Sequence, residues 1–272
     1  MAKGTVVAPF VYDGLQARMV EAAGFDAMYH TGWGNASSRG LPDVGLITLT
    51  EMTERIRILS SSADIPIISD ADTGYGSYTN VIRTVREYEQ AGAAALHIED
   101  QVWPKRCGYM QGKQIIEKKE AANKIKAAVD ARKSEKDLVI IARTDALAPL
   151  GWDAAEERAR TYYEMGADMI FFDGIRTRQD VEEYYRRMSD IPCVFNNVPM
   201  IPLEEVEQYK FPLIIHPGMT FHSWKAMFDD LEALKKTGRS LYTDDYTTLF
   251  NKLTRVLGAD YYFTLDEQYK NL

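Results

Sequence analysis

The sequence has few of the residues on which several classes of protein depend. Only two of its 272 residues are cysteine, Cys107 and Cys193, so at most one disulfide can form and a disulfide scaffold is excluded. No cysteine or histidine pair has the spacing of zinc ligands. No apolar run approaches the roughly 18 residues of a membrane-spanning helix, and no hydrophobic leader follows Met1. We therefore expect a protein of the reducing cytoplasm.

Basic residues are also in the minority. The chain has 32 Lys and Arg against 40 Asp and Glu, a formal net charge of −8, and no long basic run. Because a nucleic-acid groove needs clustered positive charge, we expect neither a nucleic acid nor a membrane as partner. Hydrophobic residues make up 46% and charged residues 26%, an ordinary mixture for a globular chain with a substantial core.

Short apolar runs alternate with segments of helical periodicity along the chain. The predicted strands cover residues 5–10, 26–30, 65–69, 94–98, 138–142, 169–172, 193–196 and 213–215. The predicted helices cover residues 15–24, 49–60, 78–91, 118–132, 154–165, 179–188 and 203–209. Eight strands that alternate with helices predict an α/β fold, a (β/α)8 TIM-type barrel over residues 1–220, rather than an open sheet. About three more helical stretches form a predicted C-terminal extension, residues 221–272.

Polar residues follow the predicted strands. Because all strand C-termini of a barrel meet at one face, we expect these separated residues to converge on one cavity. They are Thr31 and Gly32, Asp70 and Asp72, Glu99 and Asp100, Arg143 to Asp145, Asp173, Asn196 and Asn197, and His216. His97 and Cys193 lie within strands instead, and we expect both to be core residues.

The loop after the fourth predicted strand, residues 99–113, has the composition of an active-site lid. It carries Lys105, Arg106 and Cys107, and Gly108 permits unusual backbone angles. Because two cations flank Cys107, we expect its thiol pKa to be lowered. Cys107 is therefore a candidate acid, base or nucleophile.

Three carboxylates, Asp70, Asp72 and Glu99, end neighbouring strands with no lysine at the strand ends. Ionised carboxylates repel one another unless protons or a cation intervene, and a hard dication that keeps waters is the natural partner. These residues therefore predict a Mg²⁺ site, which Mn²⁺ could also fill. The alternative is a plain turn at Asp72, with Asp70 as a helix cap.

Two further groups suit an organic acid. The backbone N–H groups of residues 31–34 can cradle a carboxylate, although an ordinary glycine turn with Trp33 in the core has the same pattern. Arg143, at the end of the fifth predicted strand, can bind a carboxylate through two parallel hydrogen bonds. It can equally form a structural ion pair with Asp145 or Glu99, and both can hold at once.

Two motifs carry a resemblance to a known family. Lys105-Arg106-Cys107-Gly108 resembles the K-[KR]-C-G-H signature of the isocitrate lyase and phosphoenolpyruvate mutase superfamily. Residues 70–76, Asp-Ala-Asp-Thr-Gly-Tyr-Gly, resemble a second family motif, and further matches run from about residue 9 to residue 217. The cysteine is typical of the lyase-like branch, which includes methylisocitrate lyases, dimethylmalate lyases and oxaloacetate hydrolases. The phosphonate branch has asparagine in its place.

The resemblance implies a role for each matching residue. The metal ligands are predicted to be Asp70, Asp72 and Glu99, with Asp43 as an outer member of the site. The catalytic residues are predicted to be Cys107, Lys105, Arg106, Tyr109 and Arg143. The substrate-binding residues are predicted to be Thr31, Gly32, Trp33, Tyr29, Gly108, Asn196 and Asp173.

The predicted reaction is reversible cleavage of the C2–C3 bond of a 2-hydroxy di- or tricarboxylate. It gives an α-keto acid, pyruvate or glyoxylate, and a second carboxylic acid. Mg²⁺ stabilises the charge that develops on the 2-oxygen, and Cys107 on the closing lid protonates the carbanion. Lys105 and Arg106 tune the thiol and bind negative charge. Tyr12, Tyr29 and a metal-bound water are the candidates for accepting the 2-hydroxyl proton.

Three departures from the family pattern concern the half of the site that holds the second acid. Tyr109 stands where the lyases have histidine, and Asp173 stands where they usually have glutamate. Residues 196–202 are shorter than the family's loop and lack the Glu and Thr that grip the distal carboxylate. We therefore expect a smaller or more apolar, 2-alkylmalate-like acid rather than isocitrate or methylisocitrate.

Three other functions are compatible with these residues. An oxaloacetate-type carbon–carbon hydrolase keeps the cysteine motif and differs chiefly by admitting water. A phosphoenolpyruvate mutase or another enzyme of phosphonate metabolism shares the expected fold and metal, although Cys107 weighs against it. A metal-binding barrel without catalysis is the third, and the retained Cys107 and Arg143 argue against it.

The family's last barrel helix packs on a neighbouring subunit, and the predicted extension is consistent with such a swap. Its apolar residues, among them Trp224, Phe228 and Phe250, would expose a large patch in a monomer. We therefore expect a homodimer or homotetramer.

Overall fold

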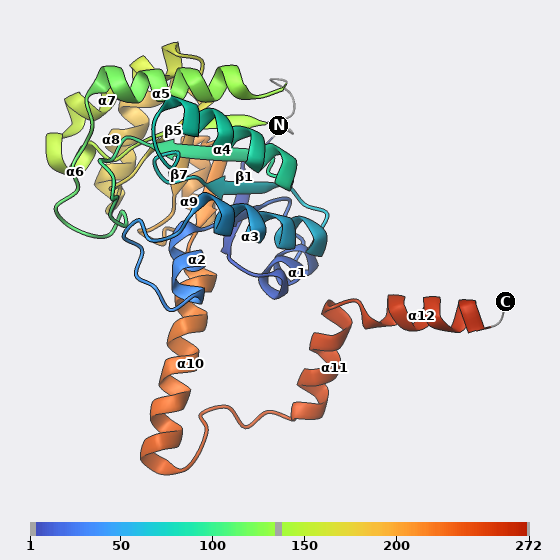
Figure 1. Cartoon of the computed structure of the whole chain (residues 1–272). Helices are drawn as coiled ribbons and strands as arrows, with labels where there is room; N and C mark the ends of the chain where they lie inside the picture. The colour runs from blue at the N-terminus through green and yellow to red at the C-terminus, as the bar shows by residue number, and fades with distance from the viewer. Residues whose placement is uncertain (1–3, 134–137, 271–272) are drawn as a thin grey trace.

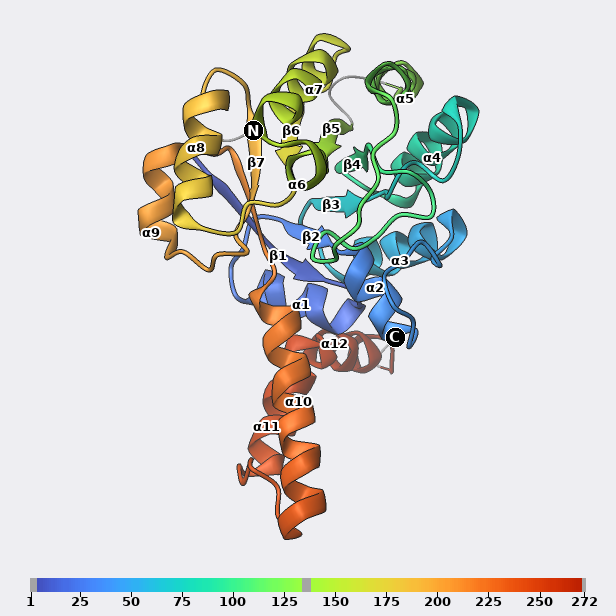
Figure 2. The same cartoon turned by 90° about the vertical axis from the view of Figure 1, so that its left-hand side faces the viewer.

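The computed structural model describes residues 4–133 and 138–270. Residues 1–3 and 134–137 of the predicted barrel domain, and residues 271–272 of the predicted extension, lie outside the described residues. Eight parallel strands close into one barrel in the order β1 to β8, with helices around it (Figures 1 and 2). The predicted (β/α)8 fold is confirmed.

The strands are short and lie close to their predicted positions. They are β1 (Val6–Val11), β2 (Met28–His30), β3 (Ile67–Asp70), β4 (Ala95–Glu99), β5 (Val139–Thr144), β6 (Met169–Phe172), β7 (Cys193–Asn196) and β8 (Leu213–His216). The barrel helices are α1 (Gly14–Ala22), α2 (Gly32–Ser38), α3 (Leu49–Ser62), α4 (Tyr78–Ala91), α5 (Lys118–Ala131), α6 (Leu147–Leu150), α7 (Trp152–Glu164), α8 (Arg178–Met188) and α9 (Leu203–Val206), which continues into the 3-10 turn η1 (Glu207–Tyr209).

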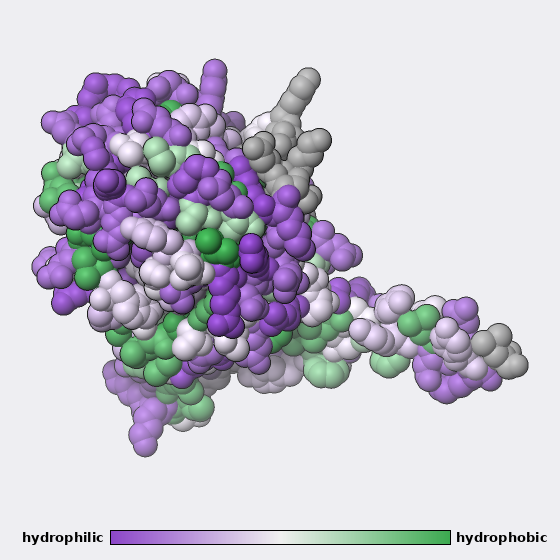
Figure 3. All heavy atoms as spheres, turned by 45° about the horizontal axis from the view of Figure 1, so that its top comes forward, coloured by the Kyte–Doolittle hydropathy of each residue, from purple (hydrophilic) through white to green (hydrophobic). Residues whose placement is uncertain are grey.

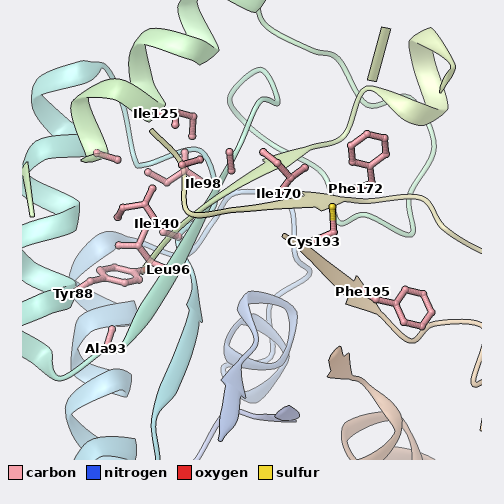
Figure 4. Packing of buried hydrophobic residues seen from close by; sticks show 14 of the residues in the cluster. Tyr88, Ala93, Leu96, Ile98, Ile125, Ile140, Ile170, Phe172, Cys193 and Phe195 are labelled. Atoms are coloured by element: carbon pink, nitrogen blue, oxygen red, sulfur yellow. The ribbon is translucent and has the colours of Figure 1, made fainter. Parts of the chain in front are cut away.

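Side chains alternate between the inside and the outside of the barrel, as the two-residue period of a strand requires. On β4, Leu96 and Ile98 pack outward against the helices, in the core layer that Figure 4 shows. Ala95 belongs to the separate cluster that fills the barrel interior, and His97 lies on the same side. The same alternation turns Glu99, at the end of the strand, into the barrel mouth.

Two short helices, α2 and α6, were not predicted. The sequence of α2, Gly-Trp-Gly-Asn-Ala-Ser-Ser, has no apolar periodicity from which a helix could be recognised. The helix begins because Thr31 caps it, its Oγ1 accepting a hydrogen bond from the backbone N–H of Gly34 at 3.2 Å. This cap fixes the segment that the sequence pattern assigns to carboxylate binding.

Three helices form an arm that leaves the barrel: α10 (Gly218–Thr237), α11 (Tyr246–Val256) and α12 (Ala259–Lys270). Figures 1 and 2 show α10 pointing away from the barrel; in Figure 1 α11 turns back toward the barrel at a distance from α10, and α12 runs sideways away from it. The arm begins inside the predicted barrel domain, because α10 starts directly after β8. Within residues 218–270, which the structure describes in full, only Gly218 and Thr220 are buried on these helices. None of the described helices has the length and hydropathy to cross a membrane.

Candidate active site

Charged side chains crowd the mouth of the barrel at the carboxyl ends of β3, β4 and β5. Asp70 lies beside His97 in the strand register, and Glu99 lies beside Arg143. The Arg143 guanidinium donates to the carboxylate of Asp145 at 2.9 and 3.1 Å, and its Nη1 lies 3.2 Å from Oε2 of Glu99. Both structural ion pairs considered for Arg143 therefore form. They hold the guanidinium rigidly at the predicted binding site.

A buried tyrosine and a buried histidine form the floor below this mouth. The hydroxyl of Tyr29 is hydrogen-bonded with Nε2 of His97 at 2.7 Å, and Nδ1 of His97 lies 3.7 Å from Asp70. Burial lowers the pKa of His97 to about 4. Burial, and then the charge of Asp70, raise the pKa of Tyr29 well above 10. Both side chains are neutral at pH 7, so His97 is the expected core residue and Tyr29 is a poor acceptor for a substrate proton.

Residues 101–116, which we call the lid, leave the end of β4 and return to it. Gln101 pairs with Ile115 in an antiparallel bridge, and the N–H of Val102 donates to the carbonyl of Gln114 at 2.8 Å. The lid is therefore closed at its base and projects as one loop. Its inner residues contact the barrel mouth.

Lys105 reaches from the lid into the carboxylates. Its Nζ is ion-paired with Asp43 and lies 2.7 Å from Oδ1 of Asp72. Burial lowers the pKa of Lys105, but the carboxylates of Asp72, Glu99 and Asp43 outweigh it and raise the pKa well above its ordinary value. The sequence shows no lysine at the strand ends, yet the fold brings this fixed cation to them from the lid.

The Cys107 thiol is buried under the lid, with 7% of the residue exposed. Its backbone N–H donates to the carbonyl of Asp43 at 3.0 Å. Burial, and then the charge of Asp43, raise the pKa of the thiol to about 12. The predicted lowering was wrong for two reasons: two carboxylates neutralise Lys105, and the exposed guanidinium of Arg106 donates to the carbonyl of Gln111 at 2.8 Å. Cys107 is thus protonated at neutral pH, which suits a proton donor.

The tip of the lid is fixed to β6 and β5. A Cβ at Gly108 would lie 2.4 Å from Oδ1 of Asp173, so only glycine fits there. The Gly108 carbonyl accepts from Arg176 at 2.7 Å and from Lys113 at 3.3 Å. Lys113 also donates to Asp173 at 2.6 Å and to Asp145 at 2.8 Å. Sequence reasoning missed Lys113 and Arg176. The signal that could have found them is their basic charge, because both lie close in sequence to predicted site residues.

Aromatic side chains line the outer end of the mouth. Tyr109 packs edge-on against Phe221 of α10 at 5.8 Å between centroids, and Trp33 stacks on Phe221 at 4.5 Å. The guanidinium carbon of Arg176 lies 4.5 Å from the Tyr109 ring centroid. Trp33 is half-buried at this wall rather than in the core. Trp33 and Tyr109 lie far apart in the sequence, but both therefore contact the same ring, that of Phe221.

The first turn of α2 lies directly against the carboxylates. A Cβ at Gly32 would be 2.6 Å from Oδ2 of Asp70, so glycine is needed for this approach. The first N–H groups of a helix have no acceptor within it. The predicted cradle thus exists as a helix start, held by the Thr31 cap described above.

Two neighbouring asparagines lie at the end of β7: Asn196 is its last residue and Asn197 follows it. Oδ1 of Asn196 is buried with no hydrogen-bond partner among the described residues. Asn197 binds Ile201 twice, donating to its carbonyl at 2.8 Å and accepting from its N–H at 2.9 Å. The shortened loop is therefore compact, and Asn196 offers an acceptor to a substrate.

Asp100 supports the site from behind. It accepts hydrogen bonds from Oγ1 of Thr144 and from the hydroxyl of Tyr162, both at 2.8 Å, and from the backbone N–H of Asp145 at 2.9 Å. Arg158 lies 3.3 Å from it. The sequence pattern groups Asp100 with the cavity residues, but its contacts show that it holds the segment carrying Asp145.

The carboxylates fit a hydrated Mg²⁺ better than an enclosed ion. Oε1 of Glu99 is buried without a hydrogen-bond partner, whereas Oε2 of Glu99 faces Arg143 and Oδ1 of Asp72 faces Lys105. Within residues 4–133 and 138–270, no three His, Cys, Asp or Glu side chains come close enough together to enclose a metal. Mg²⁺ usually keeps several waters and binds one or two carboxylates, a set that Asp72 and Glu99 supply.

Known proteins resemble this chain over nearly its whole length. The sequence profile of the family described as phosphoenolpyruvate phosphomutase matches residues 1–235. The 2,3-dimethylmalate lyase of Eubacterium barkeri is 42% identical over 267 residues, which cover 95% of this chain and 91% of that protein. The 2-methylisocitrate lyase of Aeropyrum pernix is 42% identical over 223 residues, or 80% of this chain and 71% of that protein.

Solved structures agree with the sequence relatives. A crystal structure of 2,3-dimethylmalate lyase has a TM-score of 0.88 at 38% identity and covers 98% of this chain and 91% of its own. Oxaloacetate acetylhydrolase with 3,3-difluorooxalacetate has a TM-score of 0.90 at 32% identity, covering 98% and 93%. Phosphonopyruvate hydrolase in complex with oxalate and Mg²⁺ has a TM-score of 0.85 at 26% identity, covering 97% and 94%. The chain therefore belongs to the phosphoenolpyruvate mutase and isocitrate lyase superfamily.

Proposed function

We propose that this chain is a Mg²⁺-dependent lyase that reversibly cleaves the C2–C3 bond of a 2-alkylmalate-like acid. The products are pyruvate or glyoxylate and a second carboxylic acid. The chain is a carbon–carbon lyase: relatives at 42% identity are 2,3-dimethylmalate lyase and 2-methylisocitrate lyase. The substrate, the metal and the residue roles are the proposed part.

One observation carries the proposal: the lid buries the thiol of Cys107 next to Asp43, while the neighbouring Lys105 reaches Asp72 at the barrel mouth. Cleavage of the C2–C3 bond leaves a carbanion beside a carboxylate, and this carbon needs a proton from an acid inside a site closed to water. Burial raises the pKa of Cys107 to about 12, so the proton is present at neutral pH. In the cleavage direction Sγ gives its proton to the carbanion carbon.

The α-keto acid half of the substrate lies on the barrel. Arg143, fixed by Glu99 and Asp145, binds the carboxylate, and the first turn of α2 at Gly32 offers backbone donors. Asp72 and Glu99 would hold the hydrated metal. When bound, Mg²⁺ supplies positive charge that stabilises the developing 2-oxyanion.

The second acid lies toward the lid tip, where the wall is aromatic. Trp33, Phe221 and Tyr109 present apolar surface there, and Asn196 supplies an acceptor. Such a wall favours an alkyl substituent over another carboxylate, because burying an unpaired charge is costly. This supports a 2-alkylmalate-like substrate whose C3, the carbon released with the second acid, also carries an alkyl group.

The test is incubation of the protein with pyruvate or glyoxylate, Mg²⁺ and a panel of short alkyl carboxylic acids, with products followed by mass spectrometry. We expect a condensation product with an alkyl acid, at a higher rate than with succinate. A product with succinate alone would contradict the proposed substrate. No product with any acid would contradict the proposed reaction.

Metal removal gives a second test of the same proposal. We expect chelation to abolish turnover and Mg²⁺ or Mn²⁺ to restore it, because Asp72 and Glu99 supply the carboxylate ligands that such a dication prefers, and Oε1 of Glu99 has no other partner. Full turnover in excess EDTA after dialysis would overturn the metal dependence.

A hydrolase that splits oxaloacetate is the second candidate, favoured by the match to oxaloacetate acetylhydrolase over 98% of this chain. It would produce oxalate and acetate from oxaloacetate and water. The same panel distinguishes the two activities when oxaloacetate is included.

The proposed setting is the cytoplasm, with a small carboxylic acid as the substrate. Cys107 and Cys193 are both free and buried, which suits a reducing compartment. A fractionated lysate probed for the chain would test this placement, and recovery in an oxidising compartment would contradict it.

A further inference from the structure

Lys124 on α5 is buried without an ion pair, and the carboxylate whose charge acts on it is that of Glu120, one turn earlier on the same helix. Only 7% of the residue is exposed, and its Nζ donates to the carbonyl of Thr73 at 3.2 Å. Among the residues that the structure describes, no carboxylate lies within ion-pair distance of this lysine. An ammonium group taken out of water without an ion pair is unfavourable, so an apolar side chain would serve the packing of α5 better. The position therefore calls for a role other than packing.

The carbonyl that Lys124 holds lies within a strained turn, residues 72–76. Asp72 and Tyr75 have φ angles of 45° and 59°, in the left-handed region that favours glycine. Gly74 and Gly76 also have positive φ, at 83° and 144°. A non-glycine residue in this region is strained, so the turn persists only where its surroundings hold it.

The surroundings hold the turn by its carbonyl groups. On one side of Thr73, the carbonyl of Asp72 accepts from the N–H of Glu99 at 2.8 Å. On the other side, the carbonyl of Gly74 accepts from Oγ1 of Thr84 at 3.2 Å. The lysine binds the carbonyl between them. Three consecutive peptide groups, beginning with that of a proposed metal ligand, are thus fixed from outside the turn.

We propose that Lys124 is a positioning residue for the metal site: it holds the Thr73 carbonyl and thereby fixes the left-handed backbone that presents the Asp72 carboxylate. This inference rests on the proposed function, because it takes Asp72 as a ligand of the divalent cation. Lys124 itself touches neither substrate nor metal. Groups that support a ligating carboxylate in this way typically change metal affinity about 10- to 100-fold when they are removed.

Electrostatics alone gives the opposite expectation. Lys124 binds the carbonyl of Thr73, next to Asp72 in the chain, so its charge repels a cation bound by Asp72. Removing that charge would strengthen metal binding if repulsion were its main effect. A weaker affinity in a variant without the ammonium therefore identifies positioning as its role.

The experiment measures Mn²⁺ binding to the intact chain by electron paramagnetic resonance, without substrate. Lys124→Met removes the donor but keeps the unbranched stem, and Lys124→Arg keeps a charged donor. Lys126→Met is the matched control, because Lys126 is exposed on the same helix and paired with Asp130. Asp72→Asn is the control for the metal site itself.

We expect K124M to weaken Mn²⁺ binding about 10-fold or more, K124R to restore it to within about threefold, and K126M to leave it unchanged. Wild-type affinity in folded K124M would overturn the role of Lys124. Should K124M fail to fold, Thr84→Val tests the same turn through the next carbonyl, and wild-type affinity there would overturn the proposal.

Failure of the proposed function has a different signature. If neither the wild type nor D72N binds Mn²⁺, or both bind it equally, Asp72 is not a metal ligand and both proposals fall. If D72N loses binding while K124M keeps it, only the positioning role fails.

Discussion

The thiol of Cys107 is protonated at neutral pH, so it is suited to act as a proton donor in a site closed to water. Serine in its place keeps nearly the same shape but is a much weaker acid. We therefore expect Cys107→Ser to cut turnover by ~100-fold or more while binding of pyruvate or glyoxylate stays nearly unchanged. Steady-state kinetics on the confirmed substrate and calorimetric titration with the keto acid measure the two effects.

Cys193→Ser is the matched control for this prediction. Cys193 is also free and buried, but its Sγ lies 3.8 Å from the carbonyl of Met188, outside the site. Figure 4 shows it packed among core residues. We expect this variant to keep its turnover. Near wild-type turnover of Cys107→Ser would remove the thiol from the chemistry.

His30 makes the stability of the barrel depend on pH. It is buried, with Nδ1 hydrogen-bonded with Oγ of Ser69 at 2.9 Å and Nε2 unpartnered. Burial lowers the pKa of His30 from 6.5 to about 3. Below pH 6.5 the unfolded chain binds a proton that the folded chain does not, so the free energy of unfolding falls as the pH falls. The loss from this group is about 2 kcal/mol between pH 6.5 and pH 5.

His30→Gln isolates this contribution. We expect the variant to lose less stability than the wild type between pH 6.5 and pH 5, by about 2 kcal/mol, because glutamine does not titrate. Urea unfolding at both pH values measures the difference. Equal losses in the two proteins would show that His30 does not cause this pH dependence.

We expect the lid to close the site. Arg176 holds the tip of the lid by donating a hydrogen bond to the carbonyl of Gly108. Arg176→Ala removes the hydrogen bond to the Gly108 carbonyl and the contact with the Tyr109 ring. We expect kcat/KM to fall about 10-fold and proteolysis within the lid to become faster, because an opened lid admits water. Arg178→Ala, which removes an exposed ion pair with Glu205, is the control. Unchanged kinetics and unchanged cleavage would contradict this role of Arg176.

Helices and strands could be predicted where the sequence has a regular apolar pattern. Contacts between residues distant in the chain could not. The eight strands follow from short continuous apolar runs, and most barrel helices from amphipathic periodicity, since both patterns report which residues are buried. Helix α2 was not predicted because its small residues show no apolar periodicity, and its start depends on the Thr31 cap. The positions of Asp70, Glu99 and Arg143 at the mouth followed from strand order alone.

The sign of the Cys107 pKa shift could not be read from its neighbours in sequence. Adjacent cations lower the pKa of a thiol only if their charges are unpaired and close to the sulfur. The charge of Lys105 is neutralised by Asp43, which is distant in the chain. Lys124 on α5 and Arg176 before α8 could not be assigned a role from the sequence either, because each contacts a residue that is distant in the chain. Such contacts depend on tertiary packing, of which one sequence carries no pattern.

At the scale of the whole molecule, the arm leaves too much apolar surface open for an isolated chain. Trp224, Met227, Phe228, Leu231 and Leu234 along α10 are each 48–64% exposed, and hydrophobic side chains lie open on the projecting arm in Figure 3. Monomers rarely expose continuous apolar surface on this scale. A second copy of the chain is the occupant we expect, because closed symmetric assembly covers such a face on every subunit at once.

We therefore expect a homodimer or homotetramer, with a mass two or four times the 30.9 kDa of one chain, in light scattering at micromolar concentration. Phe228→Glu with Leu231→Glu places two charges on the apolar face of α10, so this variant should shift toward the monomer. Lys235→Glu, an exposed change near the end of the same helix, should not. Because Phe221 at the start of α10 packs against Trp33 and Tyr109, loss of assembly should also lower turnover. A wild-type monomer with full activity would contradict both the assembly and this coupling of the arm to the lid.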